Sequence, residues 1–275
     1  MKSTSDIVPG RALSLGITLA VLCAAILIPL ACIVLTLQGM TPQQFLGVIL
    51  APRTLASFRL TFGASFVAAL LDLVMGSFLA WVLVRRRFVG HTLLEALVDI
   101  PFALPTAITG VTLATLYGAN GWAGRVLENA GIHVAYTPLG IGLALTFIGL
   151  PFVVRTVQPV LADLPPELDE ASALMGAGPF MRFFRVSLPL LVPAMMTGFA
   201  LAFARALGEY GSVIFIAGNM PGRTEIAPLV ILTHLEEFDY QAAAAIAVML
   251  LIVSFAMLFV INTLQRSIIR ARTAL

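Results

Sequence analysis

Residues 13–37 read LSLGITLAVLCAAILIPLACIVLTL, and no charged residue occurs anywhere between Ala12 and Pro52. An α-helix needs about 20 mostly apolar residues to cross the hydrocarbon core of a bilayer. This stretch is long enough, and it exceeds the apolar region of a signal peptide, which has about 7–15 residues. We therefore expect residues 13–37 to form a membrane-spanning helix that the mature protein retains.

The composition of the whole chain also indicates a membrane protein. Of its 275 residues, 60% are hydrophobic and only 11% are charged, and the mean hydropathy is +1.01. Soluble domains carry about 25% charged residues, so this chain has too little charge to cover a water-exposed surface. We expect a single transmembrane domain over residues 1–275, with its core at about 55–265, surrounded by a lipid bilayer and without a nucleic-acid partner.

Several further apolar stretches are long enough to span a membrane. Their uninterrupted runs favour helices, because a transmembrane β-strand would show short segments that alternate with a period of two. The predicted fold class is therefore all-α, a polytopic membrane protein with about six transmembrane helices. The candidate spans lie at about 13–37, 60–84, 100–118, 138–156, 190–216 and 241–264.

The distribution of Lys and Arg predicts the orientation, because cytoplasmic loops carry an excess of these residues. With both termini in the cytoplasm, eleven of the 16 basic residues fall on the cytoplasmic side. These eleven are Lys2, Arg11, Arg85, Arg86, Arg87, Arg155, Arg182, Arg185, Arg266, Arg270 and Arg272. Six spans return the chain to the side on which it starts, and the longest cytoplasmic connection is then predicted at about 157–189.

That connection contains residues 165–189, which read PPELDEASALMGAGPFMRFFRVSLP. Pro165 and Pro166 suit the start of a helix, where their missing N–H groups have no intrahelical partner to lose. The acidic residues that follow are favoured by the helix dipole, and Gly176 ends the helix. We expect two short helices around a glycine turn. They form either a solvated interfacial loop anchored by Arg and Phe or a knob that docks into a groove on a soluble partner.

The order of residues in this loop resembles the EAA signature of ABC-importer permeases. The matching residues are Glu170, Ala171, Ser172, Gly176, Val186, Leu188 and Pro189. Two of them depart mildly from the signature, since Ser172 replaces an Ala and Val186 replaces an Ile. In that family the loop forms a coupling helix that inserts into the ATPase subunit. The resemblance therefore implies a type I ABC-importer permease fold with a coupling loop at 157–189.

Other segments are similar to the sulfate and thiosulfate permeases, and within that group to the T (or U) subunit. They are DIPFALPTA at 99–107, LPFVVRTVQPV at 150–160, LGEYGSVIFIAGN at 207–219 and EEFDY at 236–240. The resemblance implies a permease of the bacterial inner membrane that imports sulfate, with thiosulfate as a related substrate. Its implied partners are a W-type sister permease, two ATPase subunits and a periplasmic sulfate-binding protein. Molybdate permeases share the Leu-Gly-Glu-aromatic-Gly segment, so molybdate, tungstate or another oxyanion stays an alternative substrate.

The chain lacks the residues that ATP hydrolysis would need. A phosphate-binding P-loop requires Gly-x-x-x-x-Gly-Lys followed by Ser or Thr, and Lys2 is the only lysine. The histidines His91, His133 and His234 are scattered, and their spacing indicates no catalytic or metal site. We expect no enzyme activity and no cofactor in this chain, with ATP and Mg bound by the partner ATPase.

Ionisable residues inside predicted spans are costly and are therefore candidates for function. Arg205 and Glu209 lie four residues apart on one helix face and can pair. Either they contribute to an anion pathway, or they form an internal structural pair. Prolines that interrupt a span free backbone groups near a cavity, and glycines permit close helix approach. The candidate pathway residues are Arg205, Gly208, Glu209, Gly211, Pro101 and Pro105.

Asp72 lies alone in the middle of a predicted span. A partner on a sister subunit or a water-filled cleft would each explain it, and a structural role is the alternative. A protonatable residue such as Asp72 or Glu209 would also be needed by a protein of another class, an ion-gradient-driven secondary transporter. That class leaves the EAA-like loop unexplained.

Overall fold

A computed structural model describes residues 11–273, and these residues form only helices and the loops between them. Lys2, which the orientation argument counted, lies outside the described residues. A π-helical turn, Phe183–Ser187, joins the helix Pro179–Arg182 to the helix Leu188–Leu207. The helices are α1 (Arg11–Leu35), α2 (Pro42–Ile49), α3 (Pro52–Arg85), α4 (His91–Ala103), α5 (Thr106–Tyr117), α6 (Trp122–Asn129), α7 (Pro138–Ala162), α8 (Pro166–Leu174), α9 (Pro179–Arg182), α10 (Leu188–Leu207), α11 (Val213–Ala217), α12 (Ala227–Glu236) and α13 (Tyr240–Thr273).

Five helical segments of the described chain are long and apolar enough to cross a membrane, and α4 with α5 makes a sixth if this bent pair counts as one span. The fold is thus all-α and polytopic, as expected. The third span is not the straight helix predicted at 100–118, because the chain bends by 114° between α4 and α5. The break has a local cause. A residue before proline is driven to extended backbone, and Leu104, which precedes Pro105, has ψ 134°.

The fifth predicted span also differs from the structure. It was expected at 190–216, but the helical segment runs from Pro179 to Leu207 and ends before Gly208. The short helix α11 follows after an irregular stretch at 208–212. Glu209 therefore lies just beyond the end of α10 rather than inside a continuous helix.

The core of the bundle is made by α3, α7 and α10, whose buried residues form one continuous apolar cluster. Small residues set the helix distances in this core. A Cβ added to Gly198 of α10 would lie 2.9 Å from the Cα of Val153 in α7, and one added to Gly76 of α3 would lie 2.9 Å from the Val153 Cβ. Such close approach is typical of membrane helices, which associate through packing of small residues.

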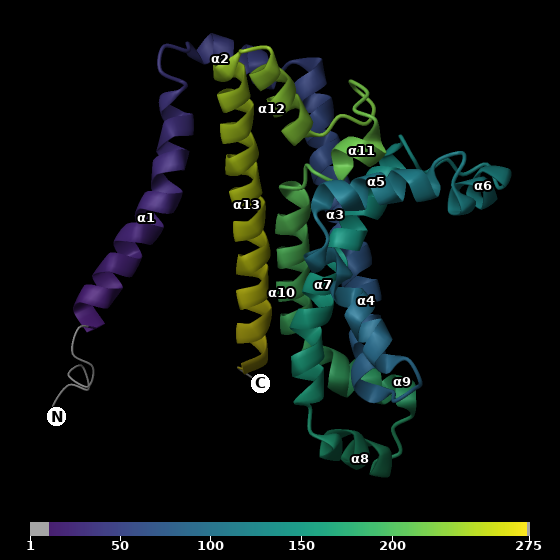
Figure 1. The fold of residues 1–275 in the computed structure, drawn as a ribbon. Coiled ribbons are helices and arrows are strands. Elements are labelled where there is room, and N and C mark those ends of the chain that lie inside the picture. The colour runs from purple at the N-terminus through teal and green to yellow at the C-terminus, as the bar shows by residue number, and fades with distance from the viewer. Residues whose placement is uncertain (1–10, 274–275) are drawn as a thin grey trace.

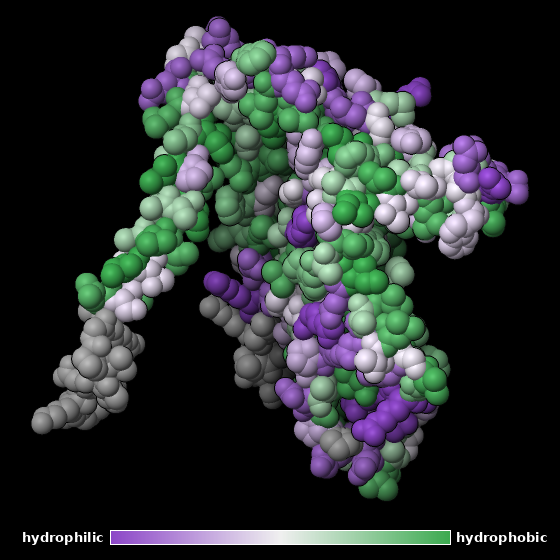
Figure 2. All heavy atoms as spheres, in the orientation of Figure 1, coloured by the Kyte–Doolittle hydropathy of each residue, from purple (hydrophilic) through white to green (hydrophobic). Residues whose placement is uncertain are grey.

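Helix α1 stands apart from this core and approaches the rest of the chain only near its C-terminal end (Figure 1). None of its residues from Leu13 to Leu35 is buried, and Figure 2 shows apolar residues along its visible surface. A helix that is apolar and unburied on this scale must be covered by lipid or by another chain.

The beginning of α1, the end of α13 and the whole of α8 lie at one end of the bundle, at the bottom of Figure 1. Helices α2 and α12 lie at the opposite end (Figure 1). Helix α3 ends at the α8 end of the bundle with Arg85, which Arg86 and Arg87 follow. The excess of Arg at this end assigns it to the cytoplasm.

Candidate functional site

The segment at 163–178, here called the α8 loop, projects from the cytoplasmic end of the bundle (Figure 1). Helix α8 has Pro at its start and Glu167 and Asp169 in its first turn, where the helix dipole favours negative charge. The hydroxyl of Ser172 donates to the Asp169 carbonyl oxygen at 3.0 Å. Glu170 and Ala171 are exposed on the same helix, and Ser172 is half-buried.

Gly176 ends this helix in a turn that favours glycine. Its φ is +81°, in the left-handed region that side chains rarely adopt. The turn is closed by hydrogen bonds from the Gly176 N–H to the Ala173 carbonyl oxygen and from the Ala177 N–H to that of Ser172, at 2.9 and 3.1 Å. A Cβ on Gly176 would meet no atom within 4 Å, so the backbone conformation, rather than lack of room, favours glycine here.

The tip of the α8 loop exposes large apolar side chains. Leu174 is 90% exposed and Met175 is 87% exposed. These two neighbours come directly before the Gly176 turn, so they form one apolar surface at the tip of the loop. An exposed apolar cluster rimmed by polar residues is typical of an interaction site.

The C-terminal end of the α8 loop leads directly into a helical segment that reaches the membrane core. Helix α9, the π-helical turn and α10 form one helical segment from Pro179 to Leu207. Leu188 and Pro189 of the signature lie half-buried in the first turn of α10. On the other side, Asp169 of α8 lies 4.0 Å from the guanidinium of Arg85 at the end of α3. The α8 loop is therefore tied to two core helices.

The candidate pathway residues at the end of α10 form a compact polar cluster. Glu209 is only 2% exposed. One of its carboxylate oxygens lies 2.6 Å from the Arg205 guanidinium. The other accepts hydrogen bonds from both the N–H and the hydroxyl of Ser212, each at 2.9 Å. The buried carboxylate is thus fully paired, which favours the structural alternative for Arg205 and Glu209.

Two helix breaks meet beside this cluster. A Cβ on Gly211 would lie 3.0 Å from the Cβ of Thr106, the first residue of α5, and a Cβ on Gly110 would lie 2.7 Å from the Ser212 Cα. The α4–α5 break at Pro105 therefore packs directly on the α10–α11 break. Gly208 has open space around it.

Pro101 lies inside α4, one turn before the α4–α5 break. The structure thus brings Pro105, Glu209 and Gly211 into one region, with Arg205 and Pro101 one turn away on α10 and α4.

One polar network was not anticipated from the sequence. The Arg155 Nε of α7 donates to Asp99 Oδ1 of α4 at 2.9 Å, and a second guanidinium nitrogen contacts Asp99 Oδ2. A third reaches Glu95 at 3.3 Å and Gln158 at 3.0 Å. This network fixes the cytoplasmic half of the broken span against α7. Asp99 and Arg155 lie in the segments 99–107 and 150–160, which resemble the sulfate and thiosulfate permeases. The sequence alone does not show that these two residues pair, because only the fold brings them together.

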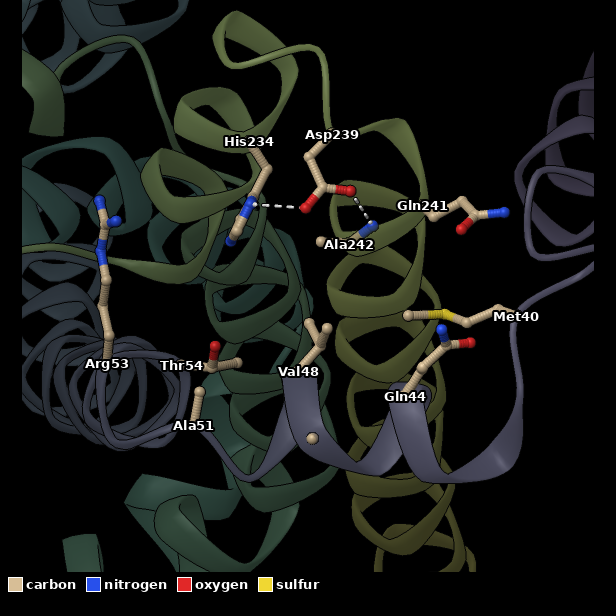
Figure 3. A pocket seen from close by; sticks show the side chains of 11 residues that line it. Met40, Gln44, Val48, Ala51, Arg53, Thr54, His234, Asp239, Gln241 and Ala242 are labelled. Atoms are coloured by element: carbon tan, nitrogen blue, oxygen red, sulfur yellow. Dashed lines mark hydrogen bonds and ion pairs between the residues drawn. The ribbon is translucent and has the colours of Figure 1, made fainter.

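The outer end of the bundle carries a cavity of about 510 Å³, lined by polar and apolar residues, between α2, α3, α12 and α13 (Figure 3). Arg53 borders it and makes two hydrogen bonds to Glu225, at 2.6 and 2.8 Å. His234 points toward Asp239, with 3.7 Å between the ring nitrogen and the carboxylate (Figure 3). No group of three or more His, Cys, Asp or Glu side chains that could hold a metal ion occurs in the described part of the chain.

The comparisons with known proteins agree with this architecture. Residues 72–273 match the family described as "Binding-protein-dependent transport system inner membrane component". The sulfate transport system permease protein CysT of Salmonella typhimurium is 49% identical over 263 residues, which cover 96% of this chain and 95% of that protein. The protein of the same name from Synechocystis is 43% identical over 91% of this chain and 87% of its own.

Among solved structures, a bacterial ABC transporter involved in the import of the acidic polysaccharide alginate has a similar chain. The TM-score is 0.77 at 15% identity, over 94% of this chain and 96% of that one. At this identity the likeness shows the fold alone. The chain belongs to the family of inner membrane components of binding-protein-dependent transport systems and has the fold of an ABC-importer permease.

Proposed function

We propose that this chain is the membrane-spanning permease subunit of an ABC importer that moves sulfate into the cytoplasm, with thiosulfate as a related substrate. The substrate class is supported by relatives named for sulfate transport, which match 91–96% of this chain. The proposed complex also contains a W-type sister permease, two ATPase subunits and a periplasmic sulfate-binding protein. ATP and Mg are bound by the ATPase subunits.

The observation that carries this proposal is the connection between the α8 loop and the membrane. Leu174 and Met175 at the loop tip are available to a groove on an ATPase subunit, in the manner of a helix that lays its apolar face into a partner. The helical segment from Pro179 to Leu207 then leads from the loop to the break before Glu209. A displacement of the loop by the ATPase would be transmitted along this one helix to the two touching breaks.

The electrostatics of the breaks suit an anion that must pass without being held. Arg205 is paired with Glu209, so it offers less attraction than a free cation would. The first N–H groups of α5, from Thr106 onward, have no intrahelical partner. They provide weak, uncharged donors for a divalent anion. Sites of this kind bind an ion favourably enough for entry and weakly enough for release.

Uptake of labelled sulfate into proteoliposomes tests the proposal. The vesicles would hold this chain with its sister permease, ATPase subunits and binding protein. ATP would be present or absent on the side of the membrane that the ATPase subunits face. We expect ATP-dependent uptake of sulfate that unlabelled thiosulfate reduces. Uptake of molybdate but not of sulfate would keep the transporter and overturn the substrate. Uptake that ignores ATP would overturn the importer itself.

A further inference from the structure

A second cavity, of about 760 Å³, lies at the cytoplasmic end of the bundle between α3 and the segment that joins the α8 loop to α10. Its wall is mostly apolar and aromatic. Phe78 and Trp81 of α3 stack on each other with their ring centroids 6.3 Å apart, and Phe183 and Leu191 also line the cavity. The proposed transport function does not use this cavity.

The cavity has a charged end. Arg85 and Arg182 line it together with Asp169, so the lining carries one more positive than negative charge. The Nε of Arg182 is buried and makes no hydrogen bond to any described residue. Arg85 and Asp169 are 4.0 Å apart, which is longer than a charge-assisted hydrogen bond of about 2.7–2.9 Å. The two guanidinium groups therefore retain donors for a ligand.

The depth of the cavity matches the boundary between headgroups and acyl chains. Arg85 is the last residue of α3, and Arg182 is the last residue of α9, one π-helical turn before α10, so both lie near the cytoplasmic ends of their spans. The apolar wall continues from there along α3 toward Val74. An amphipathic ligand would therefore place its charge at the arginines and its chain between α3 and α10.

We propose that this cavity binds an anionic phospholipid of the inner leaflet that carries a single negative charge, such as phosphatidylglycerol. Basic pockets between membrane helices on the cytoplasmic side bind such headgroups, and guanidinium groups match phosphate oxygens in pairs. The single excess positive charge of the lining favours a monoanionic headgroup over a zwitterionic one. Because Arg85 belongs to α3 and Arg182 to α9, a headgroup bound to both also holds α9 against the end of α3.

Photo-crosslinking in the complete transporter tests the site directly. Phosphatidylglycerol and phosphatidylcholine that carry the same photoactivatable acyl chain are compared in reconstituted membranes, and the labelled peptides are mapped by mass spectrometry. Phe259 on α13 is 72% exposed and serves as the reference for unselective lipid contact. We expect the phosphatidylglycerol probe to label the peptide that contains Trp81 roughly tenfold more than the phosphatidylcholine probe does. The two probes should label Phe259 equally.

Variants separate headgroup recognition from apolar filling. Arg182→Gln and Arg85→Gln should each remove most of the preference for phosphatidylglycerol at Trp81. Arg87→Gln is the matched control, because Arg87 is exposed and does not line the cavity, and it should keep the preference. Co-purification of the ATPase subunits checks that each variant still assembles.

Two results would overturn the proposal. Equal labelling of the Trp81 peptide by the two probes would mean that the cavity takes acyl chains without recognising the headgroup. Labelling of Phe259 without any labelling of the Trp81 peptide would mean that a protein partner fills the cavity. Neither result depends on sulfate transport, so the outcome is independent of the proposed function.

Discussion

The carboxyl group of Asp72 in α3 occupies the space that the absent side chain of Gly149 in α7 leaves free. A Cβ on Gly149 would collide with Asp72 Oδ2 and would lie 3.4 Å from the Cβ of Ala202 in α10. Asp72 is only 1% exposed, and its Oδ1 has no hydrogen-bond partner among the described residues. The carboxyl group is therefore enclosed by three helices of its own chain. A sister subunit or a water-filled cleft, the two explanations that the sequence suggested, does not account for it.

This packing predicts that Gly149→Ala destabilises the bundle. Inserting a methyl group into a filled core costs about 1–3 kcal/mol, so the melting temperature of the purified transporter should fall. The matched control is Gly142→Ala in the same helix, because a Cβ there meets no atom within 4 Å. The control should keep or raise the melting temperature, since Ala favours a helix by about 1 kcal/mol over Gly. Equal melting temperatures for the two variants would contradict the packing account.

The burial of Asp72 also predicts the effect of Asp72→Asn. The substitution keeps the shape of the side chain and removes an ionisable group from an apolar interior, where such a group is costly. We expect an unchanged or higher melting temperature and ATP-dependent sulfate uptake close to that of the wild type. Loss of uptake in a variant that assembles normally would point instead to a proton-coupled step at Asp72.

The pairing at the end of α10 predicts non-additive effects of two substitutions. Glu209→Gln weakens a buried charge-assisted hydrogen bond, which costs about 1.5–3 kcal/mol, and Arg205→Gln leaves the Glu209 carboxylate without its ion partner. The double variant removes both charges, so its melting temperature should lie above that of the Arg205→Gln variant. If Arg205→Gln instead leaves stability unchanged and raises the KM for sulfate, Arg205 acts on the anion rather than on Glu209.

The network between α4 and α7 predicts an order among its carboxylates. Asp99 contacts Arg155 through both of its carboxylate oxygens, whereas Glu95 contacts Arg155 through only one. Asp99→Asn should therefore lower the melting temperature more than Glu95→Gln does. The two variants should differ in their free energy of unfolding by about 1 kcal/mol or less, because these side chains are partly exposed. High salt should reduce this difference by screening. The opposite order would show that Asp99 is not the main partner of Arg155.

The parts of the structure that depend on local sequence were predictable. The apolar runs gave the approximate positions of the first, second, fourth and sixth spans. The residues around Gly176 gave two short helices with a turn between them. The Arg205–Glu209 pair was suggested by their spacing of four residues, although Glu209 lies just beyond the end of α10. In each case the physical cause lies within a few residues of the feature.

The parts that depend on distant residues were not predictable from one sequence. Asp99 and Arg155 are 56 residues apart, and Arg53 and Glu225 are 172 residues apart. Pro105 indicated an interruption, but the bend of 114° also reflects the packing of α5 on the α10–α11 turn, where Gly110 approaches the backbone of Ser212. Asp72 was visible as a charge in a span, yet its enclosure depends on Gly149 in another helix.

The proposed coupling of ATP hydrolysis to sulfate import through the α8 loop is tested most directly by one comparison of variants. Sulfate uptake and ATP hydrolysis would be measured in the same proteoliposomes for the wild type, Glu170→Ala, Gly176→Asp and Gly178→Asp. Gly176 has φ +81°, whereas Gly178 has φ −66° at the start of α9, where Asp is a favoured helix cap. We predict that uptake collapses in Glu170→Ala and Gly176→Asp while the complex still assembles, and that Gly178→Asp transports like the wild type. Full uptake in Glu170→Ala and Gly176→Asp would contradict the account.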